Sequence, residues 1–383
     1  MNSRCLIALA FVSTVWAAEE SRLTRDGDFW VQTISGSETA AHGGRFRVTT
    51  SGPVTVRGGD DNQVQYSVTK RVKAKSEREA RDLLRQFLVK AYRQGDMTFI
   101  AVAHGGEGRG SADLKITAPR SLRESVIETR GGTVDAVDLN GGLHVNTGGG
   151  AIRLDRINGT VTARTAGGEV TLGTMGGSVR CTSAGGPIRA EKIRGEAVLE
   201  TAGGDIRAGE VGGELRASTA GGAIYITQAG AGVSVNSAGG AIDVGSARGM
   251  VRAESASGAI RIGAANGVQC DTGGGGIRLS NVTGALRAST SVGNVIAQLL
   301  AGGQPQDSVL ITDLGDITVF VPSNLGIRIL AQIDSGSGRI VSDFPGVKAR
   351  TGNRQVAEGD VNGGGPLLRL SSDRGTIYIR RQK

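Results

Sequence analysis

The chain has 383 residues, of which 63 are glycine and only 7 are proline; aromatic residues make up 3%, and the formal net charge is +8. Glycine occurs without a Gly-X-Y triplet, which excludes collagen, and its regular spacing argues against a disordered linker. Binding to nucleic acid requires a basic groove interleaved with aromatic residues, so the scarcity of aromatics argues against that class.

The first residues have the pattern of a secretory signal peptide. Arg4 supplies a positive charge, an apolar run follows, and Val15 to Ala17 fit a small-x-small cleavage site. The run is too short to span a bilayer, and no later segment is apolar for long enough. The sequence therefore predicts a signal peptide at 1–18, no transmembrane segment, and an exported chain that resides in the periplasm, on the cell surface or outside the cell.

Residues 19–125 are expected to form an N-terminal α+β region. The stretches RFRVTT and VQYSVTK alternate between apolar and polar residues, as strands do. Residues 76–93 have the pattern of a helix, because Ser76 and Glu79 form a capping box and the apolar residues that follow make one stripe. This region holds most of the excess positive charge, and the role of its helix is left open.

Residues 126–300 repeat with a period of nine residues, and a second pattern within the same segment has a period of eighteen. Aliphatic residues recur every nine positions. A Thr or Ser recurs every eighteen positions, mostly before Ala-Gly-Gly: Thr129, Thr147, Thr165, Ser183, Thr201, Thr219, Ser237 and Ser255. Each half-repeat alternates with period two after its glycines, which is typical of a half-buried strand. We expect each Gly-Gly pair to supply the positive φ of a tight corner.

Two strands and two corners in eighteen residues predict one coil of a two-sheet β-solenoid. Each strand would pair with its counterpart in the next coil, about 4.8 Å away. A solenoid leaves raw sheet edges at both ends, which must be covered. We therefore assign 301–383, which contains strand-like stretches such as DITVFVP, to a C-terminal β cap.

Two features of the repeat have competing explanations. Cys181 and Cys270 fall on one inward column about five coils apart, roughly 24 Å, which is too far for a disulfide; we predict two free, buried cysteines. The Thr and Ser column could be an outward ice-binding array, but its place beside the corner favours hydrogen bonding to the corner backbone.

The same nonapeptide spacing occurs in calcium β-rolls. The aspartate position of that motif is apolar in this chain, as at Leu172, Ile226 and Val244. Calcium needs several oxygen ligands for each ion. We therefore reject a calcium site and expect no metal and no cofactor.

Arginines dominate one outward column of the predicted solenoid. The candidate ligand-binding residues are Arg153, Arg189, Arg207, Arg261 and Arg278, and the opposite face carries a second set that includes Arg180, Arg216, Arg252 and Arg287. Like charges in neighbouring coils repel. Either nearby acids neutralise these arginines, as the nearly neutral repeat favours, or the column is a track for an anionic polymer, whose carboxylates or phosphates a guanidinium can grip in bidentate fashion.

Repeated GGxIxx and TAGG units, the ITAP segment before them and the C-terminal SSDRGTIYI resemble the bacterial family described as putative adhesins, over roughly 110–383. The resemblance implies an extracytoplasmic β-solenoid and supplies no catalytic residues.

Some β-helix proteins are polysaccharide lyases or hydrolases, and glycoside hydrolysis needs two carboxylates at a defined separation. The carboxylates of this repeat are scattered along the sequence. We therefore predict a non-enzymatic, adhesin-like binding or scaffolding protein of the bacterial envelope, with an anionic envelope polysaccharide or another surface polymer as partner and no nucleic acid. The alternatives are a polysaccharide-acting enzyme and a purely structural periplasmic protein.

Overall fold

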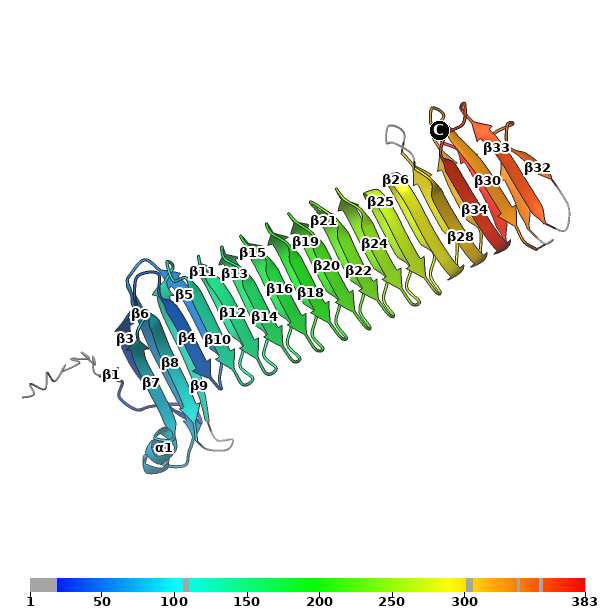
Figure 1. The fold of residues 1–383 in the computed structure, drawn as a ribbon. Helices are drawn as coiled ribbons and strands as arrows, with labels where there is room; N and C mark the ends of the chain where they lie inside the picture. The colour runs from blue at the N-terminus through cyan, green and yellow to red at the C-terminus, as the bar shows by residue number, and fades with distance from the viewer. Residues whose placement is uncertain (1–18, 106–109, 301–305, 336–337, 351–353, 383) are drawn as a thin grey trace, which may run out of the picture.

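The computed structural model describes residues 19–105, 110–300, 306–335, 338–350 and 354–382. It is a rod of stacked coils, nearly all β, in which two parallel sheets face each other (Figure 1). The predicted two-sheet β-solenoid of eighteen-residue coils is confirmed, since between residues 124 and 264 each strand pairs with the strand eighteen residues further on, as Ile206 does with Ile224. The predicted signal peptide at 1–18 lies outside the described residues.

Sheet 1 contains one of the two strands of each coil. In stacking order it consists of β8 (Met97–His104), β4 (Arg45–Thr50), β10 (Glu124–Thr129), β12 (Gly142–Thr147), β14 (Val161–Thr165), β16 (Val179–Ser183), β18 (Ala197–Thr201), β20 (Leu215–Thr219), β22 (Val233–Ser237), β24 (Val251–Ser255), the second halves of β25 (Ile260–Thr272) and β26 (Ile277–Val292), β28 (Ser308–Leu314), β34 (Leu367–Arg374) and β30 (Ile327–Ile333).

Sheet 2 contains the other strand of each coil. It consists of β9 (Gly110–Pro119), β5 (Val54–Gly59), β11 (Val134–Leu139), β13 (Ile152–Ile157), β15 (Val170–Met175), β17 (Ile188–Ile193), β19 (Ile206–Val211), β21 (Ile224–Ala229), β23 (Ile242–Ala247), the first halves of β25 and β26, β27 (Val295–Leu299), β29 (Ile317–Val321), β35 (Thr376–Arg381) and β31 (Arg339–Ser342).

The core is a set of aliphatic columns that run the length of the rod. Val170, Ile188, Ile206 and Ile224 succeed one another in sheet 2 and are fully buried. No coil can bury its own apolar face, so each depends on its neighbours for stability. The positions that would carry aspartate in a calcium roll are buried and apolar, as at Leu172.

At each end of the rod the layers are stacked out of sequence order. The coil formed by β4 and β5 lies between the coil of β8 and β9 and that of β10 and β11. The C-terminal strands β34 and β35 likewise lie between β28 and β29 on one side and β30 and β31 on the other. The parallel ladders thus extend beyond 126–300 in both directions, and the domain limits proposed from the sequence stay a prediction.

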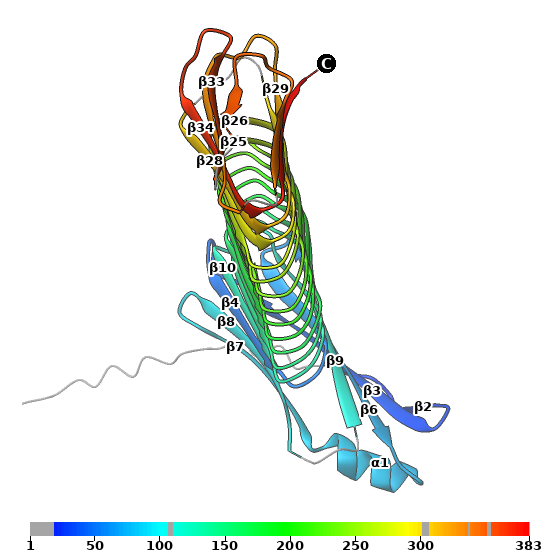
Figure 2. The same ribbon diagram turned by 90° about the vertical axis from the view of Figure 1, so that its right-hand side faces the viewer.

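Antiparallel strands cover the ends of the stack. At the N-terminal end β6 (Gln63–Lys73) pairs with β9 and β3 (Phe29–Thr39) with β6, while β1 (Glu19–Glu20) and β2 (Thr24–Asp26) pair with β3. At the C-terminal end β33 (Gln355–Val361) pairs with β30 and β32 (Lys348–Arg350) with β33. Figure 2 shows the N-terminal strands of the two sheets diverging, with α1 (Glu77–Leu84) at the far end.

The helix predicted at 76–93 is wrong in its second half. Helix α1 ends at Leu84, and β7 (Phe87–Gln94) follows as a strand antiparallel to β8. Phe87, Val89 and Ala91 point to the buried side of β7, so its apolar residues fit a strand as well as a helix. Pairing with β8 decides between them. The N-cap bond of the predicted capping box is confirmed, since Ser76 Oγ accepts from the Glu79 N–H at 3.3 Å, while the Glu79 carboxylate accepts from the backbone N–H of Lys75 at 2.9 Å.

The Gly-Gly pairs of the corners do not have the positive φ that we expected. Positive φ occurs instead at single glycines, such as Gly95 and Gly267, the second of which lies at the corner where β25 passes from sheet 2 to sheet 1. The lack of space for a side chain explains why glycine occupies the Gly-Gly corners. A Cβ placed on Gly222 would lie 2.0 Å from the carbonyl oxygen of Gly204 in the preceding coil, because the corners stack directly on one another.

The Thr and Ser column does hydrogen-bond the corner backbone, as predicted. Thr219 Oγ1 donates to the carbonyl of Gly204 in the preceding coil at 3.0 Å and accepts from the N–H of Gly222 at 3.1 Å. The same pair of bonds recurs from Thr129 to Thr272. These side chains are buried, so they form an internal ladder that joins successive coils and not an outward array.

Both cysteines of the described chain are free and buried, as predicted. Burial raises the pKa of the Cys181 thiol to about 12 and also raises that of Cys270, beside which Asp271 adds a further upward shift. The thiolate is the reactive form of cysteine. These two residues therefore act as small apolar side chains of the core.

Candidate functional site

All five candidate arginines lie on one outward column of sheet 2, and we call this column the arginine track. In register it runs Thr55, Asp135, Arg153, Thr171, Arg189, Arg207, Tyr225, Asp243, Arg261 and Arg278. Nine strand spacings separate Thr55 from Arg278, about 43 Å at the usual distance between neighbouring strands. The period of the sequence is what aligns these side chains.

Three arginines of the track are neutralised by acids. Arg189 forms an ion pair with Glu169, and Arg207 forms one with Asp205 at 3.0 Å. Arg153 lies 3.8 Å from a carboxylate oxygen of Asp135 in the preceding coil. The guanidinium of Arg207 also lies over the Tyr225 ring, 5.0 Å from its centroid. In this part of the track, nearby acids neutralise the arginines, which is one of the two explanations that the sequence left open.

Arg261 and Arg278 differ from the other three. They are direct partners in register on neighbouring strands of the ladder. Within the described residues neither has an ion pair or a side-chain hydrogen bond, although Asp243 precedes Arg261 in the column. Like charges placed opposite each other on neighbouring strands are destabilising. These two guanidinium groups are therefore available to an external anion.

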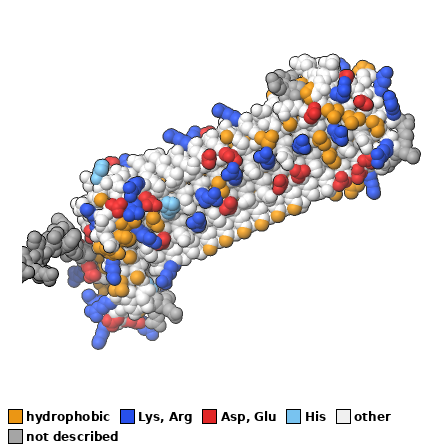
Figure 3. All heavy atoms as spheres, viewed as in Figure 1, with side chains coloured by type: hydrophobic (Ala, Val, Ile, Leu, Met, Phe, Trp, Pro, Cys, Tyr) orange, Lys and Arg blue, Asp and Glu red, His pale blue; other side chains and the backbone are white. Residues whose placement is uncertain are grey.

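The arginines of sheet 1 are arranged differently. Arg180, Arg216 and Arg252 lie in one column but are separated by Val198 and Ser234, so consecutive arginines are two strand spacings apart. Arg216 is paired with Glu214 at 2.8 Å. Figure 3, which shows the outer face of this sheet, has basic and acidic side chains scattered along the rod. Sheet 1 thus avoids the direct contact of like charges found at the end of the track.

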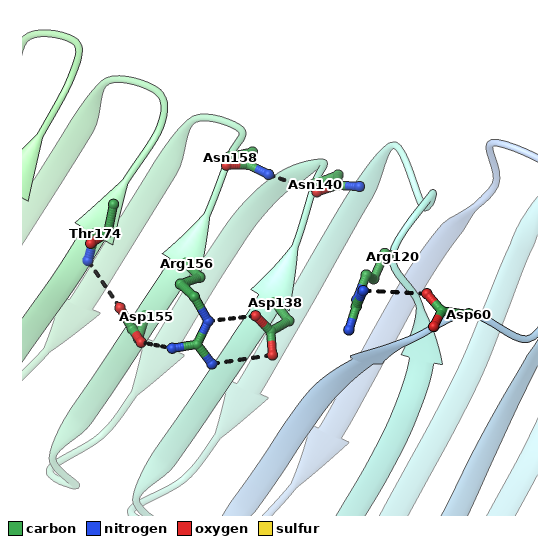
Figure 4. Close-up of polar contacts among 8 residues, drawn as sticks. All are labelled: Asp60, Arg120, Asp138, Asn140, Asp155, Arg156, Asn158 and Thr174. Carbon is green, nitrogen blue, oxygen red and sulfur yellow. Dashed lines mark hydrogen bonds and ion pairs between the residues drawn. The ribbon is translucent and has the colours of Figure 1, made fainter.

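A network of ion pairs crosses the first coils where sheet 2 bends toward the next corner (Figure 4). Arg156 binds Asp138 through two bonds, of 2.6 and 3.2 Å, and also binds Asp155. Asp155 accepts in turn from the backbone N–H of Thr174 at 3.0 Å. Arg156 lowers the pKa of Asp138, chiefly through its hydrogen bond. A glycosidase acid needs a raised pKa, and the shift of Asp138 is in the opposite direction.

Lowering the pH below about 4 should weaken this network. The pKa of Asp138 is depressed in the folded chain, so its contribution to stability is complete above its ordinary value of 3.8 and is lost as the pH falls through the folded pKa. Urea titrations of the wild type and of Arg156→Gln at several pH values test this. The wild type should lose more free energy of unfolding on acidification than the variant, and parallel losses would show that the network contributes nothing.

A polar hollow lies beside the start of the track, on the outer face of β3, β6, β9 and β5. Its volume is about 730 Å³. Its outward side chains are Ser35, Ser37, Thr55, Arg57, Gln63, Gln65, Ser67, Lys115 and Thr117. Our sequence reasoning missed this group. The alternation in VQYSVTK and ADLKITAP marks the polar faces, but nothing in the sequence says that β3, β6, β9 and β5 lie side by side.

Within the described residues, no group of three or more His, Cys, Asp or Glu is placed to hold a metal ion. The single described helix is too short and too polar to cross a membrane.

No family model and no curated protein matches the chain. Solved structures do show likeness to it. A putative adhesin from Bacteroides fragilis is 12% identical with a TM-score of 0.29, and the alignment covers 91% of this chain and 97% of that one. A putative cell adhesion protein from Clostridium sporogenes is 10% identical, with a TM-score of 0.18 and coverage of 91% and 100%.

A putative lipid binding protein from Parabacteroides distasonis is 14% identical with a TM-score of 0.29, and here the coverage is 75% of this chain and 96% of that one. Two of these three proteins carry an adhesin or cell-adhesion description, as does the family that the sequence resembles. Likenesses this remote do not assign a function, which has to be argued from the surface of this chain.

Proposed function

We propose that the protein is an exported, adhesin-like binding protein of the bacterial envelope and that its arginine track binds an anionic polysaccharide or similar surface polymer. The observation that carries the proposal is the unneutralised pair Arg261 and Arg278. All five arginines, Arg153, Arg189, Arg207, Arg261 and Arg278, contribute to the field along the track, and the unneutralised pair makes the direct contacts.

The pairing pattern supports this division of roles. Arg189 and Arg207 are also neighbours in register, but each has an acid that offsets the repulsion. For Arg261 and Arg278 a bound polyanion would supply the missing negative charge. A guanidinium can bind a carboxylate through two parallel hydrogen bonds, and strands about 4.8 Å apart would present two such groups side by side. Such binding weakens with added salt, because these side chains are open to solvent.

A pair of matched double variants tests the proposal. Arg261→Ser/Arg278→Ser removes the unneutralised arginines, and Arg153→Ser/Arg189→Ser removes the same charge from paired positions. With polygalacturonate as probe at low salt, we expect the first variant to lose at least tenfold in affinity and the second less than threefold. Equal losses would mean that only net charge matters, and an unchanged affinity in both would refute the track.

A further inference from the structure

The hollow beside the track is built from two rows of polar side chains that cross four hydrogen-bonded strands. One row is Ser37, Gln65, Thr117 and Arg57, and the other is Ser35, Ser67, Lys115 and Thr55. Period-two alternation turns all eight side chains to the same face, away from buried residues such as Val64 and Ile116. The rows therefore present hydroxyls, an amide and two cations on one surface.

Most of these groups have no partner of their own. Among the described residues, the eight side chains make two hydrogen bonds, from Ser35 to Ser67 at 3.4 Å and from Gln65 to Asp61 at 3.3 Å. Arg57 and Lys115 have no ion pair there. They are diagonal neighbours, since Arg57 pairs with Thr117 and Lys115 with Thr55, which places them about 7–8 Å apart at their backbones.

The floor of the hollow, which is the backbone of these paired strands, is rigid. Residues of β3 and β6 pair without interruption from Phe29 to Thr39. On the buried side, the ring of Tyr66 covers Gly36, where a Cβ would lie 2.4 Å from the tyrosine oxygen. Tyr66 is buried, so it fills the space that Gly36 leaves. A rigid floor keeps the outward polar groups in place before a ligand arrives, which lowers the cost of binding.

We propose that this hollow binds a short acidic saccharide, a ligand that combines several hydroxyls with a carboxylate. The hydroxyls and amide of the two rows match sugar hydroxyls, and Arg57 and Lys115 match the carboxylates of successive acidic sugars. A simple anion would use the cations but leave the rest of the hollow to water. The proposal rests on the proposed function, because it names a second contact point for the same class of polymer.

The position of the hollow agrees with this assignment. Its row through Lys115 ends at Thr55, the first residue of the arginine track, which continues in register to Asp135 and Arg153. A chain held in the hollow could therefore extend along the rod. The unneutralised pair is far away, since Arg261 lies eight strand spacings from Thr55, about 38 Å. A trisaccharide in the hollow cannot reach it.

Calorimetric titration with trigalacturonate tests the hollow separately from the far end of the track. Because Arg261 and Arg278 are themselves proposed to bind acidic sugars, every protein in this titration carries Arg261→Ser/Arg278→Ser, and this background alone should still bind trigalacturonate in the hollow. Arg57→Gln/Lys115→Gln should bind at least tenfold more weakly. Since Arg57 lies near the Asp138 network, Lys115→Gln alone serves as a second variant that leaves this network intact, with an expected loss of at least threefold.

Three results would overturn the hollow as a saccharide site. The first is no binding of trigalacturonate by the Arg261→Ser/Arg278→Ser background at millimolar concentration, and the second is unchanged binding when Lys115→Gln is added to it. The third is inorganic phosphate or monomeric galacturonate binding as tightly as the trisaccharide, which would leave a simple anion site. Maltotriose, which has hydroxyls but no charge, should bind more weakly than trigalacturonate. None of these results bears on the arginine track. The track is tested separately, by the binding of polygalacturonate to Arg261→Ser/Arg278→Ser.

Discussion

Replacing Gly222 with alanine is expected to cost about 4 kcal/mol or more of unfolding free energy, a loss otherwise typical of severe core defects. The new Cβ would lie 2.0 Å from the carbonyl oxygen and 2.4 Å from the carbonyl carbon of Gly204. Both are backbone atoms, and both belong to a coil held in place by its own neighbours. The coils would have to separate locally to relieve the contact, which would break the ladder at this corner.

The adjacent glycine provides the control. A Cβ on Gly221 would have no heavy atom nearer than 3.7 Å, and neither glycine has a positive φ. Alanine at a position with room restricts the unfolded chain, so Gly221→Ala should be neutral or should stabilise by up to about 1 kcal/mol. Thermal and urea unfolding of the two variants measure the difference. Similar stabilities would contradict the steric explanation of the Gly-Gly corners.

Replacing Thr219 with valine is expected to cost about 2–4 kcal/mol, although the two side chains have nearly the same shape. The substitution leaves the carbonyl of Gly204 and the N–H of Gly222 without the partner that each has in the folded chain. A buried polar group without a partner costs about 1–3 kcal/mol. Thr219→Ser keeps both bonds, as Ser237 does in the next coil, and should cost far less.

Hydrogen exchange locates this effect, because a long repeat array need not unfold in one step. In Thr219→Val the amides of Gly222 and its neighbours should exchange faster than in the wild type, while amides several coils away keep their protection. A valine variant as stable as the serine variant, with normal exchange at Gly222, would show that the ladder of hydroxyls does not hold the coils together.

The repeat could be predicted from the sequence because its information is local. A period of nine places Ile206 and Ile224 in the core and Arg207 outside, whatever the rest of the chain does. What failed depended on distant segments. Phe87 to Gln94 has apolar residues that suit either a helix or a strand, and only β8 decides. The sequence suggested that the Gly-Gly pairs supply a positive φ. Their real requirement is steric, because the backbone of the preceding coil leaves no room for a Cβ.

The same distinction holds for the candidate site. The period aligned the arginine track, but it did not show that Glu169 neutralises Arg189 or that Arg261 lacks such a partner, since ion pairing depends on side-chain reach between coils. The hollow depends on the antiparallel register of β3, β6 and β9, which no repeat specifies. The sequence also could not predict that the coils at both ends are stacked out of chain order, because this stacking brings together segments that lie far apart in the chain.

The most direct test of binding along an extended surface is the affinity of the wild-type protein for galacturonate chains of increasing length. If the hollow and the pair Arg261 and Arg278 hold one chain, affinity should rise with length until the chain spans about 40 Å, then level off, since linked contacts reinforce one another only once both sites can be reached. A trisaccharide that binds as tightly as the long polymer would contradict the extended surface.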